Sequence, residues 1–188
     1  GEIFILENAD LPIHLQQQVD VFLFGCYTAL SISDLKRVKK DVIINNKIEL
    51  RRNKTEGILK IPLIEEARSI LEKYNYKLPF ISNNKGSENL KKAFKILEID
   101  RKVRITKKYY DSNATDYFVP LCDVISWHKS RKTAITTAIK KGIPHIIVMK
   151  LSGHRKVETF MKYVELANDD LENEMNKLSK TKNESIAA

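Results

Sequence analysis

Residues 128–163 carry an ordered set of reactive side chains that constrains this chain more than any other feature. The set begins with His128 and Arg131 in a His-x-x-Arg motif, continues with a Gly-His pair ending at His154, and ends with Tyr163. His154 follows Arg131 by 23 residues, and Tyr163 follows His154 by nine. Arg and His donate hydrogen bonds to anionic oxygens, and the Arg fork matches two phosphate oxygens at once. A phenol with a pKa of about 10 needs such a cationic environment to act as a nucleophile. The set therefore predicts chemistry on a phosphodiester.

The local pattern places these side chains on two helices and a turn. Residues 126–141 are predicted to be a helix that begins at the N-cap Ser126, so that His128 and Arg131, three apart, share a face. Residues 152–154 are predicted to turn the chain at a glycine. Residues 156–166 are predicted to form a second helix with Tyr163 between apolar neighbours, and the apolar residues between the two helices (Ile146, Ile147 and 149–151) are predicted to be core.

The rest of the chain predicts a mainly α, α+β fold. Residues 41–63 read as a small three-stranded antiparallel sheet, because an Asn-Asn turn and a Gly-containing turn separate runs of alternating polarity. Residues 103–110 and 115–120 read as two further strands. The apolar periodicity predicts helices at 11–30, 64–75 and 169–180, a short helix capped by Ser31 or Ser33, and a helix capped by Ser87.

Composition narrows the class of partner. The chain has 188 residues, enough for one domain, and a formal net charge of +9, which favours a polyanion such as nucleic acid. The two cysteines, Cys26 and Cys122, do not suggest a disulfide framework, so we expect a reducing cytoplasm. We see no signal peptide, no apolar run of membrane-spanning length and no metal-ligand spacing, so no membrane, metal or cofactor is expected.

The ordered motifs resemble the active site of the tyrosine recombinases, also called phage-type integrases. Residues 28–35 resemble the family's Thr-Gly-Leu-Arg-x-Ser-Glu-Leu box, but Ser31 stands where the family has its first catalytic Arg. Integrases of Bacteroides-type conjugative and mobilisable elements resemble this chain in lacking that Arg. The phrase RNKTEGILKIPL resembles the hairpin that carries the family's catalytic Lys, and it places Lys54 in that position.

The resemblance implies a role for each matching residue. Tyr163 would attack a DNA phosphate to give a 3′-phosphotyrosine, and Lys54 would protonate the 5′ oxygen that leaves. Arg131, His128 and His154 would bind the phosphate and its developing charge, with no cofactor.

Strand alternation adds a hypothesis of its own. It places Arg52 on the same face as Lys54, so Arg52 is a candidate substitute for the Arg missing at Ser31. Lys132, Arg155, Lys107 and Lys108 are candidate contacts to the DNA backbone, although the same positions also suit an ordinary exposed surface.

We therefore expect residues 1–180 to form the catalytic domain of a recombinase from a mobile element, followed by a disordered tail at 181–188. The family's N-terminal core-binding and arm-binding domains are expected to lie outside this chain. The resemblance implies double-stranded attachment sites as substrate, a monomer that becomes a tetramer on DNA, and accessory DNA-bending proteins. It also implies a bacterial cytoplasm, in association with the nucleoid.

Two kinds of alternative stay open at this stage. One is another enzyme with the same chemistry, either a type IB topoisomerase or a recombinase that resolves chromosome dimers. The other is a DNA-binding relative that has lost catalysis, for which the missing Arg at Ser31 is the best argument.

Overall fold

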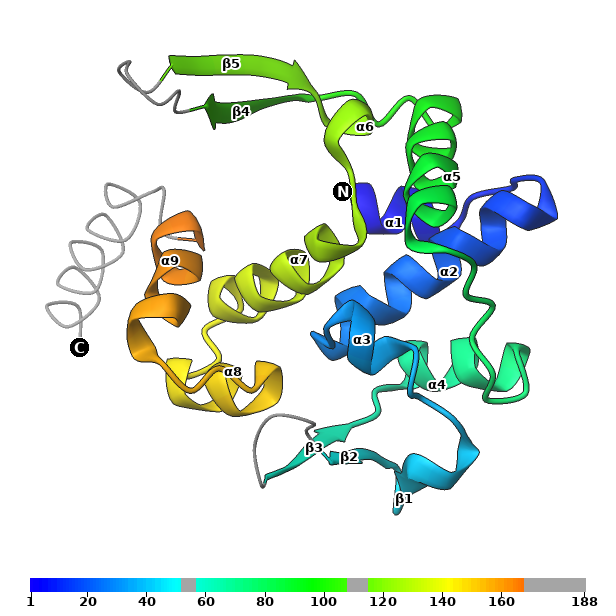
Figure 1. Cartoon of the computed structure of the whole chain (residues 1–188), viewed down its shortest axis with the longest axis vertical. Coiled ribbons are helices and arrows are strands. Elements are labelled where there is room, and N and C mark those ends of the chain that lie inside the picture. Colours follow the sequence, from blue (N-terminus) through cyan, green and yellow to red (C-terminus); the bar gives the residue numbers. More distant parts are fainter. Residues whose placement is uncertain (52–56, 108–114, 168–188) are drawn as a thin grey trace, which may run out of the picture. The chain divides into compact units, whose positions relative to one another are not determined.

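The computed structural model describes residues 1–51, 57–107 and 115–167, in which helices predominate over two small antiparallel sheets (Figure 1). This confirms the predicted mainly α class with its three-stranded sheet. The chain divides into two compact units, residues 1–134 and the part from residue 135 onward. The helix α7 (Trp127–Lys140) begins in the first unit and continues into the second.

The core of the first unit is built around one central helix, α2. It packs against the helices α1, α4 and α5. Their bounds are α1 (Glu2–Glu7), α2 (Ile13–Thr28), α4 (Glu65–Lys73) and α5 (Asn83–Ile96). Phe22 of α2 meets Phe94 of α5 edge-on, with the ring centroids 5.8 Å apart, and both rings are buried. The helices predicted at 11–30 and 64–75 are thus confirmed as α2 and α4.

The three-stranded sheet follows the predicted alternation. Its strands β1 (Ile43–Ile44), β2 (Lys47–Arg51) and β3 (Ile58–Pro62) pair antiparallel in the order β1-β2-β3. Ile48 and Leu50 are buried opposite Ile61 and Leu59, while Lys47 and Arg51 are exposed. The Asn45-Asn46 turn has φ angles of 49° and 59°, which asparagine tolerates better than most residues.

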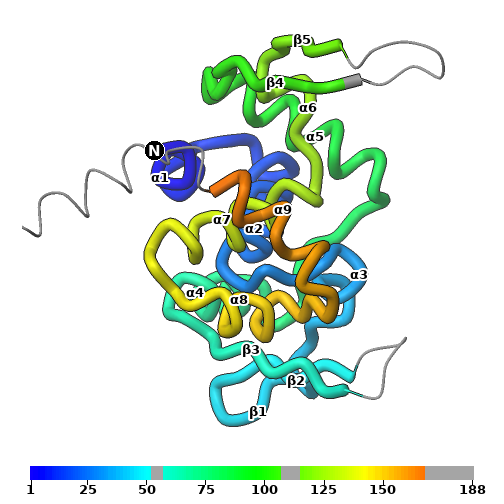
Figure 2. The backbone as a smooth tube through the Cα atoms, turned by 90° about the vertical axis from the view of Figure 1, so that its left-hand side faces the viewer, coloured from blue at the N-terminus to red at the C-terminus, as the bar shows by residue number. Residues whose placement is uncertain are grey.

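A second hairpin consists of β4 (Lys102–Lys107) and β5 (Thr115–Pro120), as predicted. The short helix α6 (Leu121–Val124) follows β5 and packs against α5. Within the first unit, this hairpin and the three-stranded sheet lie at opposite ends, as the tube view also shows (Figure 2).

The start of α5 differs from the sequence prediction. The helix begins at Asn83 with Ser82 as its N-cap, whose Oγ accepts a hydrogen bond from the Lys85 amide, so the predicted cap at Ser87 is wrong. The Asn-Asn-Lys-Gly stretch has the composition of a loop, but Gly86 lies inside the helix for a packing reason. A Cβ atom there would come 2.7 Å from Cζ2 of Trp127, so only glycine leaves room for the indole ring.

The second unit contains α8 (His145–Ser152) and α9 (Val157–Ala167). Val148, Met149, Phe160 and Val164 are buried in it. The prediction that Ile146, Ile147 and Lys150 are core is wrong, since 60% and 48% of the two isoleucine surfaces are exposed and Lys150 is exposed as well. A single helical turn cannot bury four consecutive apolar residues, and α8 buries the later pair.

We expect Gly86→Ala to lower the free energy of unfolding. Overpacking against Trp127 costs about 1–3 kcal/mol, and the better helix propensity of alanine offsets about 1 kcal/mol of it. Chemical denaturation measures the net change. Gly57→Ala is the control, because no neighbouring atom lies near a Cβ at that position. A Gly86→Ala variant more stable than the parent protein would contradict the proposed packing.

Candidate active site

The first turns of α7 are held against the first unit by three neighbouring side chains. The Trp127 indole covers Gly86 and lies 5.7 Å, between centroids, from the Phe80 ring. Ser130 is fully buried against α2 at Gly25, where a Cβ would lie 2.4 Å from its Oγ. Positions 127, 130 and 131 share one helix face, so these contacts also fix where Arg131 lies.

Arg131 reaches the end of α2. Its Nη1 donates a hydrogen bond of 2.7 Å to the carbonyl oxygen of Ala29, the residue that ends α2 in the left-handed conformation (φ 55°). Ala29 lies two residues before Ser31. The His-x-x-Arg helix and the segment that resembles the first-Arg box are therefore neighbours in space.

Ser31 has a structural role of its own at this junction. It is the N-cap of α3 (Ile32–Leu35), and its Oγ accepts a hydrogen bond from the Asp34 amide and donates one of 2.7 Å to Asp34 Oδ2. This confirms the predicted short helix and selects Ser31 over Ser33 as its cap. The position where the family has a cationic side chain is here occupied by a helix cap.

Sequence reasoning missed Arg37, which connects this junction to the sheet. Arg37 Nη2 donates a 2.6 Å hydrogen bond to the carbonyl oxygen of Arg51, at the end of β2, and its Nη1 lies 3.5 Å from Asp34 Oδ1. No motif marks Arg37 in the sequence. Arg37 lies in the turn after α3, and its spacing of three residues from Asp34 signals the ion pair with Asp34 but not the hydrogen bond to Arg51.

His128 is an exposed residue on the cationic side of α7. Its pKa is lowered from the ordinary value, first by partial loss of hydration and then by the charges of Arg131, Lys129 and Lys132. The ring is therefore largely neutral at pH 7, with one nitrogen able to donate and the other to accept. The same α7 turn carries Lys129, whose pKa is also lowered by loss of hydration and by neighbouring cations. A concentration of positive charge of this kind suits an anionic ligand.

The second unit brings His154 and Tyr163 together. Gly153 ends α8 in the left-handed conformation (φ 70°), as the sequence predicts, and His154 follows it. The His154 ring lies 5.2 Å from the Tyr163 ring and 5.8 Å from the buried Phe160 ring, between centroids. Both Tyr163 and His154 are half-buried.

The structure describes only some of the remaining predicted site residues. Lys54, Arg52 and Lys108 lie outside the described residues, as does the side chain of Lys107. Lys132 is half-buried on α7, and Arg155 is exposed after the Gly-His turn. The helix predicted at 169–180 also lies outside the described part.

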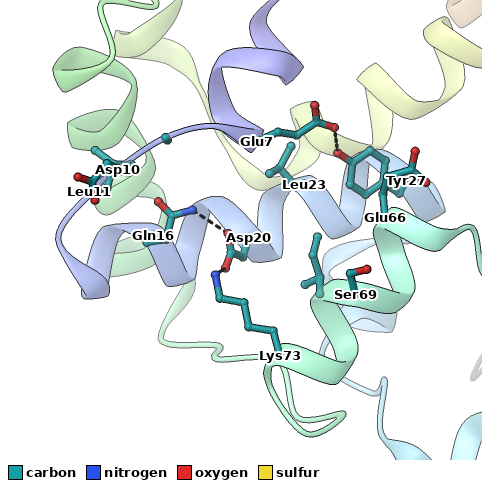
Figure 3. Close-up of a pocket in the computed structure, with 12 residues that line it drawn as sticks. Glu7, Asp10, Leu11, Gln16, Asp20, Leu23, Tyr27, Glu66, Ser69 and Lys73 are labelled. Carbon is teal, nitrogen blue, oxygen red and sulfur yellow. Dashed lines mark hydrogen bonds and ion pairs between the residues drawn. The ribbon is translucent and has the colours of Figure 1, made fainter.

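A cavity of about 390 Å³ lies elsewhere in the first unit, among α1, α2 and α4 (Figure 3). The buried Asp20 carboxylate in it accepts hydrogen bonds from Gln16 (2.8 Å) and Tyr74 (2.6 Å) and pairs with Lys73 at 2.7 Å. Tyr27 donates to Glu7 on its other side, and burial together with this carboxylate raises the pKa of the Tyr27 phenol. The acidic side chains that line this cavity would repel a phosphate group.

Two further observations concern the described residues only. No group of three or more His, Cys, Asp or Glu side chains there is arranged to hold a metal ion. Over the same ranges, every helix is too short or too polar to cross a membrane.

Comparison with known proteins places these features in a family. Residues 20–169 match the sequence profile of the phage integrase family. A comparison with curated proteins finds no match.

Solved structures with the same fold include three recombinases. XerH bound to palindromic difH substrate is 11% identical (TM-score 0.62; 92% of this chain, 49% of that chain). XerA recombinase is 18% identical (TM-score 0.58; 93% and 60%). The Tn1549 transposon integrase in complex with circular intermediate DNA is 17% identical (TM-score 0.56; 86% and 58%). This chain thus spans about half to three fifths of the length of these proteins.

We expect His128 to titrate below 6.5, the pKa of an unperturbed histidine. The unfolded chain then binds the proton more readily, so the His128 contribution to stability is present above pH 6.5 and is lost as the pH falls through the folded-state pKa. NMR titration of the ring measures the midpoint. Arg131→Gln should raise it only in part, because loss of hydration remains. A midpoint above 6.5 in the parent protein would contradict this electrostatic description.

Proposed function

Because the chain belongs to the phage integrase family, we propose that it is the catalytic domain of a site-specific tyrosine recombinase that cuts and rejoins DNA. The observation that carries the proposal is the ordered set from His128 to Tyr163. The geometry of each unit supports it, since Arg131 lies at the junction before Ser31, and His154 lies beside Tyr163.

The proposed reaction exchanges one phosphodiester for another. The Tyr163 phenol loses its proton to solvent and its oxygen attacks the scissile phosphorus, the bond from phosphorus to the 5′ oxygen breaks, and a 3′-phosphotyrosine forms. Lys54 gives a proton to the 5′ oxygen as it leaves. The 5′-hydroxyl of a partner strand then attacks the phosphotyrosine and releases the phenol. The number of ester bonds is unchanged, so no energy-supplying cofactor is needed.

Arg131 is well suited to hold the phosphate during this exchange. Its hydrogen bond to the Ala29 carbonyl uses one terminal nitrogen and restrains the guanidinium group. Arg carries five N–H donors in a rigid fork, which a lysine at the same position would not reproduce. Preorganised donors of this kind stabilise the charge that develops as phosphorus is attacked.

Arg37 supports the assignment of Lys54. Lys54 follows Arg51 by three residues, and Arg37 binds the Arg51 carbonyl. Arg51, the last residue of β2, is therefore bound to the turn that follows α3. In this proposal Arg37 holds the end of β2, which precedes Lys54 in the sequence, while Asp34 orients Arg37.

The substrate and setting are part of the same proposal. We propose double-stranded attachment sites of a mobile element as the DNA, a homotetramer on that DNA and residues 1–180 as one catalytic domain of a cytoplasmic bacterial enzyme. A net charge of +9 supports DNA binding that weakens as salt is raised, because phosphate contacts release counterions.

A second candidate is a DNA-binding relative without catalysis. The observation that favours it is the commitment of Ser31 to capping α3. A type IB topoisomerase would share the first chemical step but would relax supercoils without exchanging strands between sites.

We expect the parent protein to form a covalent adduct with DNA and Tyr163→Phe to form none, because phenylalanine has no nucleophilic oxygen. The substrate is a pool of nicked duplexes with a randomised core, since the target sequence is unknown. Cleavage beside the nick releases a short fragment and traps the adduct, which denaturing gels detect.

Tyr76→Phe is the matched control, because Tyr76 lies in the first unit beside Lys40 and far in sequence from the Gly-His pair. Its adduct should equal that of the parent protein. No adduct from a parent protein that binds a recovered site tightly would favour the non-catalytic relative.

We expect Arg52→Ala to lower the rate of adduct formation about 10²-fold or more if Arg52 replaces the missing Arg, by analogy with the loss of other preorganised donors. Arg51→Ala should have little effect, because the Arg51 side chain is exposed and only its carbonyl binds Arg37. Single-turnover assays compare the two variants. Equal rates would show that Arg52 supplies no such charge.

A further inference from the structure

His154 is held to the end of α8 by its backbone. Its amide donates a 3.0 Å hydrogen bond to the Met149 carbonyl, while the Gly153 amide donates one of 3.2 Å to the Lys150 carbonyl. This pair of bonds, around a left-handed glycine, is the Schellman arrangement that ends many helices. The main chain of His154 is therefore fixed relative to α8 before its side chain is considered.

The His154 ring is held as well, by the residue just before the glycine. Ser152 is buried, with 1% of its surface exposed, and its Oγ lies 2.8 Å from His154 Nδ1. The same Oγ lies 2.7 Å from the Val148 carbonyl oxygen, four residues back. One hydroxyl thus joins the ring to the backbone of the last turn of α8.

These two distances determine where the protons are. A carbonyl oxygen can only accept, so a 2.7 Å approach to it requires the hydroxyl proton to point at Val148; otherwise two lone pairs would face each other. The hydroxyl has no second proton to give. The 2.8 Å contact with His154 can then be a hydrogen bond only if Nδ1 carries a proton and Ser152 accepts it.

We propose that Ser152 is a positioning residue that fixes His154 in the tautomer protonated on Nδ1. The consequence of this tautomer for catalysis rests on the proposed function. A neutral His154 then presents a lone pair at Nε2, and it can donate to a phosphate from Nε2 only as the doubly protonated imidazolium. Ser152 thereby makes the contact between His154 and the phosphate a charged one, which is shorter and stronger than a neutral hydrogen bond.

The packing of the ring supports a fixed orientation. Phe160 is fully buried and lies 5.8 Å from the His154 ring, and the Tyr163 ring lies 5.2 Å from it, between centroids. With Nδ1 tied to Ser152 and aromatic neighbours beside it, the ring cannot rotate by half a turn without breaking the hydrogen bond. In histidine side chains generally, the hydrogen bond made by one ring nitrogen decides which nitrogen carries the proton, and Ser152 makes that bond here.

The first test reads the tautomer directly. NMR with ¹⁵N-labelled histidine, at a pH where the ring is neutral, distinguishes a protonated Nδ1 from a protonated Nε2. We expect Nδ1–H in the parent protein and a shift toward Nε2–H in Ser152→Ala. Ser152→Thr keeps the hydroxyl and should keep Nδ1–H. A parent protein with Nε2–H, or a Ser152→Ala variant with an unchanged tautomer, would overturn the proposal.

The second test asks whether the tautomer affects catalysis. Ser152→Ala should slow Tyr163-dependent adduct formation about 10- to 100-fold, by analogy with the loss of a residue that orients a metal-bound imidazole, and Ser152→Thr should recover much of the rate. Ser69→Ala is the matched control, because Ser69 makes the same kind of bond to a carbonyl four residues back, at 3.0 Å from Glu65, without a histidine partner.

An unchanged rate in Ser152→Ala, despite a moved proton, would overturn the catalytic role of Ser152. A parent protein that shows Nδ1–H but forms no Tyr163 adduct would instead overturn the proposed function, and with it the meaning of the tautomer for catalysis. The two failures are thus distinguished by two independent measurements.

Discussion

The attachment of the first turns of α7 to the first unit is the constraint on which the candidate site depends. Arg131 binds the Ala29 carbonyl at 2.7 Å, and the flanking Trp127 and Ser130 approach α5 and α2 so closely that glycine is required at both contact points. A guanidinium group on a surface helix would otherwise sample many rotamers. Here packing of Trp127 and Ser130 holds the helix and the hydrogen bond to Ala29 restrains the guanidinium group, which favours stabilisation of developing charge without reorganisation.

In the second unit, His154 is oriented by a helix end and a neighbouring hydroxyl. His154 follows a helix end closed by two backbone hydrogen bonds, and its ring is bonded to the hydroxyl that precedes the glycine. The short motif Ser-Gly-His therefore contains a cap, a turn and a ring restraint in three consecutive residues. Tyr163 lies on the next helix, beside the ring that this motif holds. In each unit a backbone carbonyl group helps to orient a functional side chain: Ala29 binds Arg131 directly, and Val148 binds Ser152, which contacts His154.

Sequence patterns predicted the helices and strands whose formation depends on residues close together in the chain. Alternating polarity predicted the three-stranded sheet, and spacing predicted the α7 and α9 helices with their reactive residues. The errors have tertiary causes: Gly86 looked like part of a loop because its partner Trp127 is distant in sequence. Arg37 and Ser152 were missed because their roles are bonds to a backbone carbonyl and to a neighbouring ring, which no residue pattern encodes.

The central claim is that Tyr163 becomes covalently joined to DNA. The most direct measurement is mass spectrometry of the protease- and nuclease-digested adduct, formed by the full-length gene product on nicked DNA recovered from a randomised pool. Our account predicts a nucleotide attached through its 3′ phosphate to the peptide that contains Tyr163. A nucleotide attached to another residue, or attached through a 5′ phosphate, would contradict it.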